Sequence, residues 1–251
     1  KLLDLKLLYV ELESFVYYDP SKVSTASDLK TNITNGLLNY ASSTDLNKFG
    51  GRFKYSKVLN VIDNIDDAIS SNISRVVIRR NLKALTNQFA QYELCYGNSF
   101  HINPEGRNIK STGFTIQGQS DTVYLTDIPN KNVDGTLDGS GKGVLAIVKG
   151  NIEQAENRLV VASAGIVDYA HGEIILSTIN ITSTIKTNNI IEIQAFPESN
   201  DVIGLKDLYL SFSVSDSVIN MVKDTITSGE QISGVGYKVT SSYSNGALIR
   251  G

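Results

Sequence analysis

The sequence contains very little cysteine and no tryptophan. Its 251 residues include one cysteine, Cys95, so no disulfide can form within the chain. Cys95 lies in an alternating apolar run, where a small buried thiol is the ordinary interpretation, and nothing requires an oxidising compartment. A glycoside hydrolase needs two carboxylates across a cleft lined with aromatic rings, whereas Glu11 and Glu13 are two residues apart and share one strand face. We therefore expect neither a disulfide scaffold nor a glycosidase.

An excess of one charge and long apolar runs are also missing. The formal charge is -3, from 23 Lys+Arg against 26 Asp+Glu, with no basic block that could follow a phosphate backbone. No apolar run approaches the roughly 20 residues that span a bilayer, and the start lacks the pattern of a signal peptide. We therefore expect no nucleic-acid and no membrane partner. Because Lys1-Leu2-Leu3 resembles the inside of an element, we expect the chain to be the C-terminal part of a longer polypeptide.

The first part of the chain has the pattern strand, helix, glycine turn, helix, strand. An alternating run from Leu8 ends at Asp19-Pro20, and Leu29, Ile33 and Leu37 then recur at the spacing of one helical turn. Thr25 and Ser27 can cap this helix. A second helix begins near Ser56, after Gly50-Gly51, and β-branched residues at 73–80 predict a strand. This pattern predicts a β-α-α-β unit over residues 1–86.

Beyond about Thr86 the sequence favours short strands separated by Gly, Asn, Asp, Ser and Pro. We expect residues 87–251 to form a second domain of mainly antiparallel sheet, so the predicted fold class is α+β. A polar segment near 130–143 predicts a mobile loop, and residues 229–251 predict an irregular tail docked by tyrosines. The expected strands are 89–96, 113–117, 123–126, 144–149, 158–161, 173–185, 190–196, 208–214 and 218–225.

The polar loop resembles a phosphate or calcium motif only in part. A P-loop ending at Gly141-Lys142 needs Gly where Thr136 stands and Ser or Thr where Gly143 stands. A calcium loop beginning at Asp134 needs a bidentate carboxylate at its twelfth position, which is Leu145. We therefore interpret this segment as a hairpin connection.

His171 raises two further possibilities for catalysis. His171-Gly172-Glu173 matches the His-x-Glu of zinc deaminases, but the two downstream cysteine ligands are missing. Ser163, Asp168 and His171 have the residue types of a hydrolase triad, yet three residues so close along a strand and turn point in incompatible directions. We predict that the chain is not an enzyme and has no catalytic residues, no cofactor and no metal site.

Two charge clusters remain, for which solvated faces are the ordinary interpretation. The other interpretation is that the opposite clusters meet across a contact between copies of the chain and fix its register. The candidate interface residues are Asp63, Asp66, Asp67, Arg75, Arg79 and Arg80.

Several stretches together resemble a known family. They are FVYYDP at 15–20, FGGRFKYS at 49–56, VLNVID at 58–63, GIVDYAHGEIIL at 165–176, GVGY at 234–237 and SNGAL at 244–248. The first three resemble the baseplate J-like proteins of contractile-tailed phages, and the others resemble the longer baseplate wedge proteins of T-even phages.

The resemblance implies a structural role in the virion tail. In such proteins copies pair, and the pairs link neighbouring wedges into a ring around the central hub. It also implies other baseplate wedge proteins as partners and assembly in the cytoplasm of the bacterial host.

Two other functions stay open at this point. A β-sandwich adhesin or carbohydrate-binding module is the main alternative, with Tyr237 and Tyr243 as candidate glycan contacts. A hydrolase that uses the region from Asp168 to His171 is the other.

Overall fold

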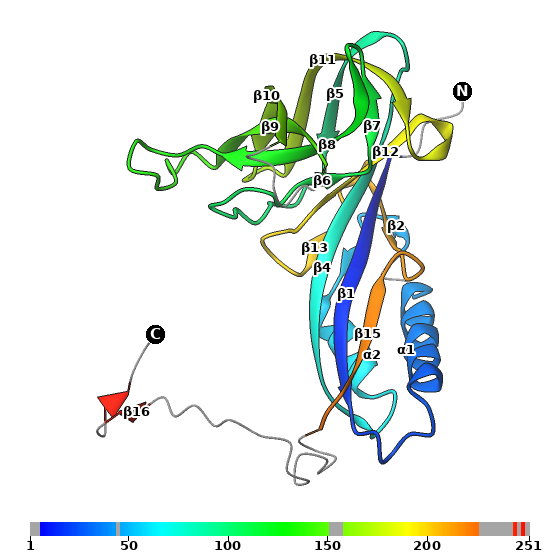
Figure 1. Ribbon diagram of the computed structural model, residues 1–251. Helices are drawn as coiled ribbons and strands as arrows, with labels where there is room; N and C mark the ends of the chain where they lie inside the picture. Colours follow the sequence, from blue (N-terminus) through cyan, green and yellow to red (C-terminus); the bar gives the residue numbers. More distant parts are fainter. Residues whose placement is uncertain (1–5, 44–45, 151–157, 226–242, 245–246, 249–251) are drawn as a thin grey trace.

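The computed structural model describes residues 6–43, 46–150, 158–225, 243–244 and 247–248. Strands dominate this part of the chain, where about 50% of residues are in strands and 14% are helical. It contains a seven-stranded sheet, a six-stranded sheet and two short two-stranded sheets. Figure 1 shows the seven-stranded sheet running along the two helices, with the second sheet curled at its upper end.

The seven-stranded sheet combines segments from both ends of the chain. Its order is β2-β14-β1-β4-β12-β6, and β15 also pairs with β1. β1 and β4 are antiparallel, whereas β14 and β15 lie parallel to β1 along successive parts of its other edge. Its strands are β1 (Leu7–Tyr18), β2 (Lys48–Phe49), β4 (Ile69–Lys83), β6 (Lys110–Ser111), β12 (Ile190–Ala195), β14 (Tyr209–Phe212) and β15 (Val218–Lys223).

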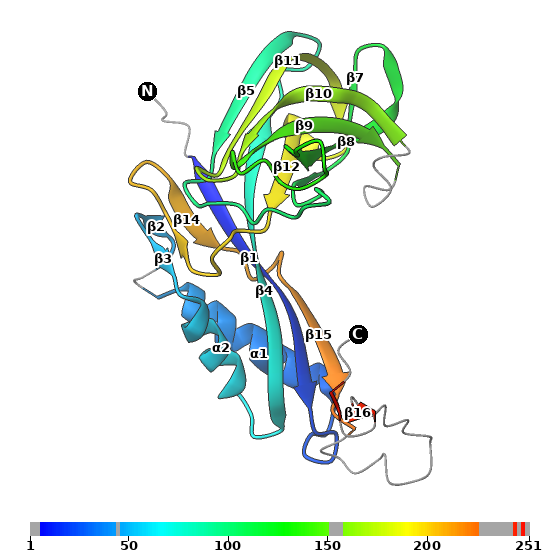
Figure 2. The same ribbon diagram turned by 90° about the vertical axis from the view of Figure 1, so that its left-hand side faces the viewer.

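Two helices, α1 (Ala26–Ala41) and α2 (Tyr55–Asp63), cover one face of this sheet (Figure 2). The predicted apolar positions of α1, Leu29, Ile33 and Leu37, are all buried, in one cluster with the even-numbered residues Leu8, Val10, Leu12 and Val16 of β1. Because successive side chains of a strand point to opposite faces, the odd-numbered residues of β1 point away from the helices. At the start of α1, Thr25 is the N-cap, because its hydroxyl accepts a hydrogen bond from the backbone N–H of Asp28.

The chain between the helices makes a sharp turn. β2 and β3 (Arg52–Phe53) flank Gly50, whose φ of +63° favours glycine, as the Gly-Gly pair predicted. β3 pairs with β13 (Val202–Ile203), and the backbone N–H of Tyr55 at the start of α2 donates to Asp201. The helical region is thus joined to residues almost 150 positions later in the chain.

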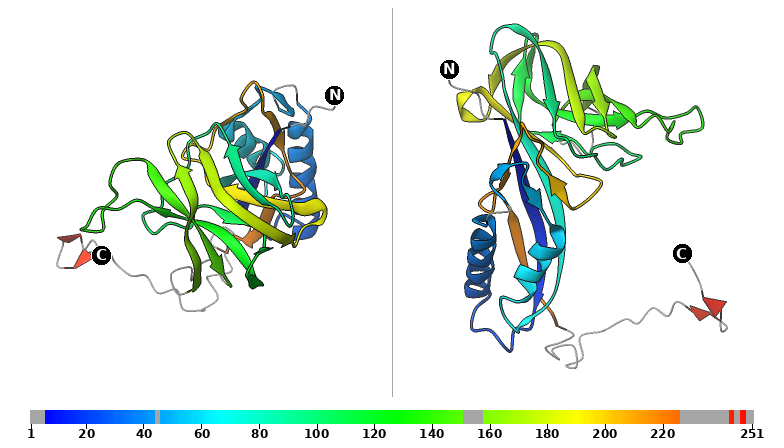
Figure 3. Two further views of the ribbon diagram at one scale, coloured as in Figure 1. Left: turned by 90° about the horizontal axis from the view of Figure 1, so that it is seen from above. Right: turned by 180° about the vertical axis from the view of Figure 1, so that it is seen from behind.

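The second sheet closes into a five-stranded barrel. β10 pairs with both β9 and β11, which completes the ring β7-β8-β9-β10-β11, and β5 adds to β11 outside the ring. Figure 3 shows this barrel from above and from behind. Its strands are β5 (Phe89–Cys95), β7 (Phe114–Ile116), β8 (Gln119–Pro129), β9 (Lys142–Lys149), β10 (Leu159–Asp168) and β11 (Glu173–Thr184). A 3₁₀ turn, Thr187–Asn189, leads from β11 into β12, and β16 (Tyr243–Ser244) pairs with β17 (Ala247–Leu248) near the end of the chain.

The predicted fold class, α+β with an N-terminal β-α-α-β unit followed by an antiparallel domain, is wrong. The described residues are mostly strand, with two α-helices and a barrel. β1 and β4 form the middle of a sheet that β12, β14 and β15 complete, so the described part of the chain contains no self-contained β-α-α-β unit. Local periodicity indicates that a segment is a strand but not which segment pairs with it, which is why the prediction failed.

The predicted division into residues 1–86 and 87–251 stays a prediction. Strands β12, β14 and β15 all follow residue 86 and pair within the first sheet, so any division into two domains has to assign them to the first.

The predicted loop near 130–143 is exposed and includes an isolated bridge between Lys131 and Leu137. Its mobility stays a prediction too. Within the described residues, neither α-helix has the length and apolar character needed to cross a membrane.

Candidate association surface

An apolar patch lies on the face of the long sheet that the helices leave uncovered. Phe15 of β1 is 47% exposed, Ile73 of β4 is 63% exposed and Val218 of β15 is 50% exposed. Phe15 stands directly opposite Ile73, and Val218 stands beside Glu13, two residues from Phe15 on the same face. Directly opposed residues have Cβ atoms about 4.5–5.5 Å apart, so Phe15 and Ile73 are close neighbours, whereas Val218 lies diagonally from Phe15, at about 7–8 Å. We call Phe15, Ile73 and Val218 the apolar stripe.

A pair of opposite charges borders the apolar stripe. Glu13 and Arg75 are opposed in the register of β1 and β4, one pair above Phe15 and Ile73, and both are exposed. The Arg75 guanidinium lies 3.8 Å from the centre of the Phe196 ring, which fixes the arginine against the sheet. The stripe therefore has a polar border with both signs of charge, as the rim of a protein interface usually has.

Beyond this pair the same face carries a buried ionic network centred on Arg79. Arg79 Nε bonds to Glu11, while its Nη atoms contact Glu192 at 3.2 Å and Asp216 at 2.7 Å. Gln194 Nε2 donates to the second oxygen of Glu11 at 2.7 Å, and the Tyr9 ring lies under the guanidinium at 4.3 Å. The network ties β1, β4, β12 and the turn between β14 and β15 together.

The charges of this network act on one another. Burial raises the pKa of Glu11, although Arg79 and Gln194 lower it by hydrogen bonding. Burial by itself lowers the pKa of Arg79, but Glu11, Glu192 and Asp216 outweigh that effect and raise it. A charged arginine with three carboxylates therefore links the strands in the upper part of the sheet, on the same face as the exposed stripe.

The structure places the six predicted interface residues in different environments. Asp63 accepts a hydrogen bond from Asn72 at 2.6 Å on the helix side of β4. Asp66 accepts a hydrogen bond from the backbone N–H of Ala68 at 2.9 Å. Asp67 is exposed, and Arg75 is exposed on the opposite face of β4. Arg79 and Arg80 are buried within the chain, 4% and 9% exposed. The acidic and basic clusters are thus not brought together within one chain, and a role between chains stays a prediction.

Sequence reasoning missed the apolar stripe. A signal was present, because Phe15 belongs to an uninterrupted apolar run, FVYY at 15–18, rather than to an alternating one. A strand with apolar residues on both faces predicts that both faces are covered, and among the described residues the helices cover only one of them.

The region proposed as a hydrolase site holds a turn. Nδ1 of His171 lies 3.1 Å from Asp168 Oδ1, and the backbone N–H of His171 donates to the same oxygen at 3.0 Å. Against the raising effect of burial, these contacts lower the pKa of Asp168. Among the described residues, no hydrogen bond joins Ser163 to either group. The geometry is that of a hairpin connection between β10 and β11.

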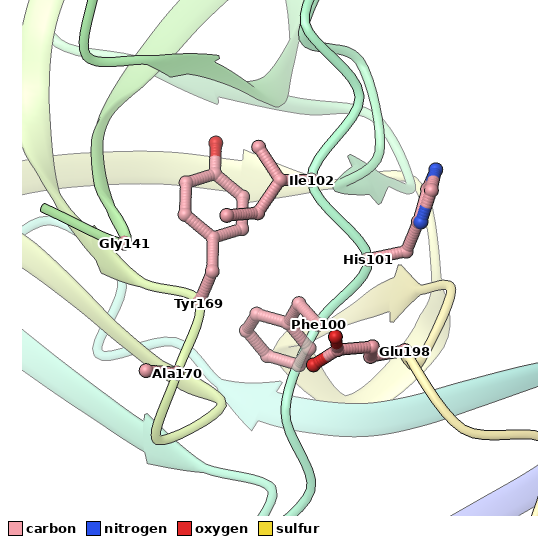
Figure 4. A pocket seen from close by; sticks show the side chains of 7 residues that line it. All are labelled: Phe100, His101, Ile102, Gly141, Tyr169, Ala170 and Glu198. Carbon is pink, nitrogen blue, oxygen red and sulfur yellow. The ribbon is translucent and has the colours of Figure 1, made fainter. Parts of the chain in front are cut away.

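A cavity of about 280 Å³ near this turn is lined by aromatic rings and two polar side chains (Figure 4). Phe100 and Tyr169 fill its wall, and the side chains of His101 and Glu198 point in different directions. The Tyr169 hydroxyl donates to Asp127 at 2.7 Å instead of facing a ligand. Within the part of the chain that the structure describes, no group of three or more His, Cys, Asp or Glu could hold a metal ion.

Neither tyrosine suggested for glycan binding has a described side chain. Tyr237 lies outside the described residues, and for Tyr243 only the backbone, in β16, is described. The aromatic contacts proposed for an adhesin therefore stay a prediction.

Comparison with known proteins identified one family. Residues 6–81 match the family described as "Baseplate structural protein gp6, C-terminal domain III". The matched segment runs from the start of β1 to near the end of β4 and includes Phe15 and Ile73 of the apolar stripe. A comparison with curated proteins gave no match.

The match supports a structural protein of the phage tail baseplate, located in the virion tail and associated with other baseplate proteins. The family is a structural one and not an enzyme class. The finer resemblances to baseplate J-like and T-even wedge proteins stay predictions.

Proposed function

We propose that this chain is a self-associating subunit of a contractile phage tail baseplate wedge, which links neighbouring wedges into the ring around the central hub. The observation that carries the proposal is the match of residues 6–81 to a baseplate structural family. Other wedge proteins are its further partners, and assembly takes place in the cytoplasm of the bacterial host.

The apolar stripe is the surface best suited to contact a second copy. Phe15 and Ile73 lie side by side and Val218 lies diagonally from Phe15, on a sheet whose strands the Arg79 network links. Since about half of each side chain is still exposed, burying it would contribute about 1 kcal/mol per residue. Such a gain supports a contact of moderate strength, as expected where a ring has to let subunits move.

Charged residues would set the register of the contact. Arg75 lies next to the stripe, whereas the exposed Asp63 and Asp67 and the partly exposed Asp66 offer the opposite charge away from it, at and just after the end of α2. Rim charges of this kind act more on the rate and specificity of association than on its strength. Arg79 and Arg80 support the surface from within, because their guanidinium groups bond to other parts of the same chain.

The proposal is tested by the oligomeric state. Sedimentation velocity of the 251-residue chain over a range of concentrations is expected to show a reversible dimer, and the double variant Phe15→Glu/Ile73→Glu is expected to be monomeric. Ile166→Glu is the matched control, because Ile166 lies on β10 of the barrel and is 54% exposed, much like Ile73. A strict monomer at high concentration, or equal dissociation in the Ile166 variant, would count against self-association through the stripe.

A further inference from the structure

The two central strands of the long sheet separate at one end. β1 and β4 pair from Tyr9 opposite Arg79 downward. Above that point β1 continues to Leu7 beside β14, while β4 continues to Lys83 beside β12. The upper ends of β1 and β4 separate (Figure 2), and a cavity of about 310 Å³ lies there.

The wall of this cavity is positively charged. Lys6, Arg80 and Lys83 line it together with Tyr9 and Asn81, and no carboxylate is among the described residues that line it. The nearest acid to Lys6 is Asp207, 3.9 Å away, and both side chains are largely exposed, so this pair is weak. Among the described residues Lys83 makes no ion pair. We call the cavity and its three cations the cationic fork.

Arg80 is the unusual member of the fork. It is 9% exposed, its Nη1 donates to the carbonyl oxygen of Cys95 at 2.6 Å, and its buried Nε has no hydrogen-bond partner. A buried charge is costly unless it is paired. The preceding residue, Arg79, has three carboxylates bonded to it, whereas Arg80 bonds to a carbonyl oxygen and has one carboxylate, that of Asp207, acting on it through space. The fork therefore has three cations near one exposed carboxylate of the described chain, which leaves an excess of positive charge.

We propose that the cationic fork binds a carboxylate side chain, Asp or Glu, from an acidic segment of another protein of the assembly. The identity of this partner as a baseplate protein rests on the proposed function. Leu7 and Ile190 line the cavity beside the cations, and this mixed apolar and cationic wall fits the stem and head of an acidic side chain better than a free inorganic anion. Tyr9 and Asn81 also line the cavity, and both residue types carry neutral hydrogen-bond donors.

The test uses hexaglutamate as the acidic probe and hexaglutamine as its neutral control, with the 251-residue chain followed by ¹⁵N NMR shifts. Saturable binding of hexaglutamate but not of hexaglutamine is expected. Lys83→Gln is expected to weaken binding about threefold to tenfold, since one charge-assisted contact is lost. Lys6→Gln is expected to act in the same direction. Both lysines are exposed, so these variants keep the test valid even if Arg80→Gln fails to fold.

Lys30→Gln is the matched control, because Lys30 is an exposed lysine of α1 outside the fork. Loss of affinity of the same size in this variant, or no saturable binding to the unmodified chain, would overturn the proposal. A titration with inorganic phosphate forms a separate arm. Phosphate binding at the same residues with equal affinity would overturn the assignment to a protein carboxylate. None of these outcomes bears on the dimer, which sedimentation measures independently.

Discussion

Two adjacent arginines of β4, Arg79 and Arg80, have different surroundings. Arg79 and Arg80 are adjacent and form part of one basic cluster in the sequence, yet their side chains leave β4 on opposite faces. Arg79 meets three carboxylates, whereas Arg80 meets a backbone carbonyl oxygen and lines a cavity. The sequence predicted both as interface residues, but the structure gives Arg79 a role within the fold.

Arg79→Met is expected to destabilise the chain by about 3–5 kcal/mol, because it leaves Glu11 buried without its partner. Chemical denaturation measures the free energy of unfolding. Arg52→Met is the control, since Arg52 is exposed on β3, and its effect is expected to stay within about 0.5 kcal/mol. A similar loss in both variants would show that Arg79 has no special role. For the same reason, charge reversal at Arg79 and Arg80 is expected to unfold the chain before it reports on any contact between chains.

Asp127 should give stability a pH dependence. It is 1% exposed and accepts hydrogen bonds from the backbone N–H of Ile109 at 2.6 Å and from Tyr169. Burial raises its pKa above the ordinary value of 3.8, although both hydrogen bonds lower it. The folded state therefore holds the proton more tightly than the unfolded state. The contribution of Asp127 to stability is largest below 3.8 and is lost as pH rises through the raised pKa.

Asp127→Asn removes this titration. Thermal unfolding between about pH 4 and pH 8 is expected to show the melting temperature of the variant gaining on that of the unmodified chain as pH rises. Asp121→Asn, at an exposed carboxylate of β8, should not change the shape of the pH profile. Parallel profiles for Asp127→Asn and the unmodified chain would contradict the assigned effect of burial.

Among the elements, α1 is the one whose boundaries and buried face follow most directly from local chemistry. The hydroxyl of Thr25 accepts the backbone N–H of Asp28 at 3.1 Å, and Leu29, Ile33 and Leu37 recur on the buried face. Both features depend only on residues close in sequence, which is why they could be predicted.

Thr25→Ala is expected to destabilise the chain by about 1 kcal/mol through loss of the cap. Thr34→Ala is the matched control. Thr34 lies within α1, and its hydroxyl bonds back to the carbonyl oxygen of Lys30, so replacement by alanine should be neutral or slightly stabilising. Denaturation curves of the two variants measure the difference. Equal losses would show that the cap is not the source of the effect.

Local chemistry does not reveal the barrel. All nine predicted strand segments after residue 86 are confirmed as strands. The closure of the second sheet into a barrel, however, depends on the pairing of β10 with both β9 and β11. Gly165 lies at this closure, and a Cβ there would come within 2.0 Å of the carbonyl oxygen of Ile175. This glycine permits a close approach of two strands, which depends on pairing between segments and not on a local pattern.

At the scale of the whole molecule, self-association should make stability depend on protein concentration. If the dimer binds through the apolar stripe, only the folded chain can form it, so the melting temperature is expected to rise with concentration. Phe15→Glu/Ile73→Glu should remove this dependence, while Ile166→Glu should retain it. Differential scanning calorimetry over a range of concentrations measures the effect. A melting temperature independent of concentration in the unmodified chain would contradict the dimer.

The candidate surface was predictable only in part. The exposed aspartates and Arg75 stand out as charge clusters in the sequence, but the apolar stripe requires the registers of β1 with β4 and of β1 with β15. Val218 follows Phe15 by some two hundred residues, and no local pattern connects them. The cationic fork likewise exists only because β1 and β4 turn to different neighbours above Tyr9 and Arg79.

The sequence by itself determined which segments are strands and helices, where α1 begins, and that the chain resembles baseplate proteins. These features follow from side-chain periodicity, capping and residue order, which act over a few residues. Only the tertiary structure decided that the second sheet closes into a barrel, that late strands complete the first sheet, and that part of one face of the first sheet is exposed among the described residues. Strand pairing is decided by burial and hydrogen bonding between segments far apart in the chain, and local patterns do not encode which partner each strand selects.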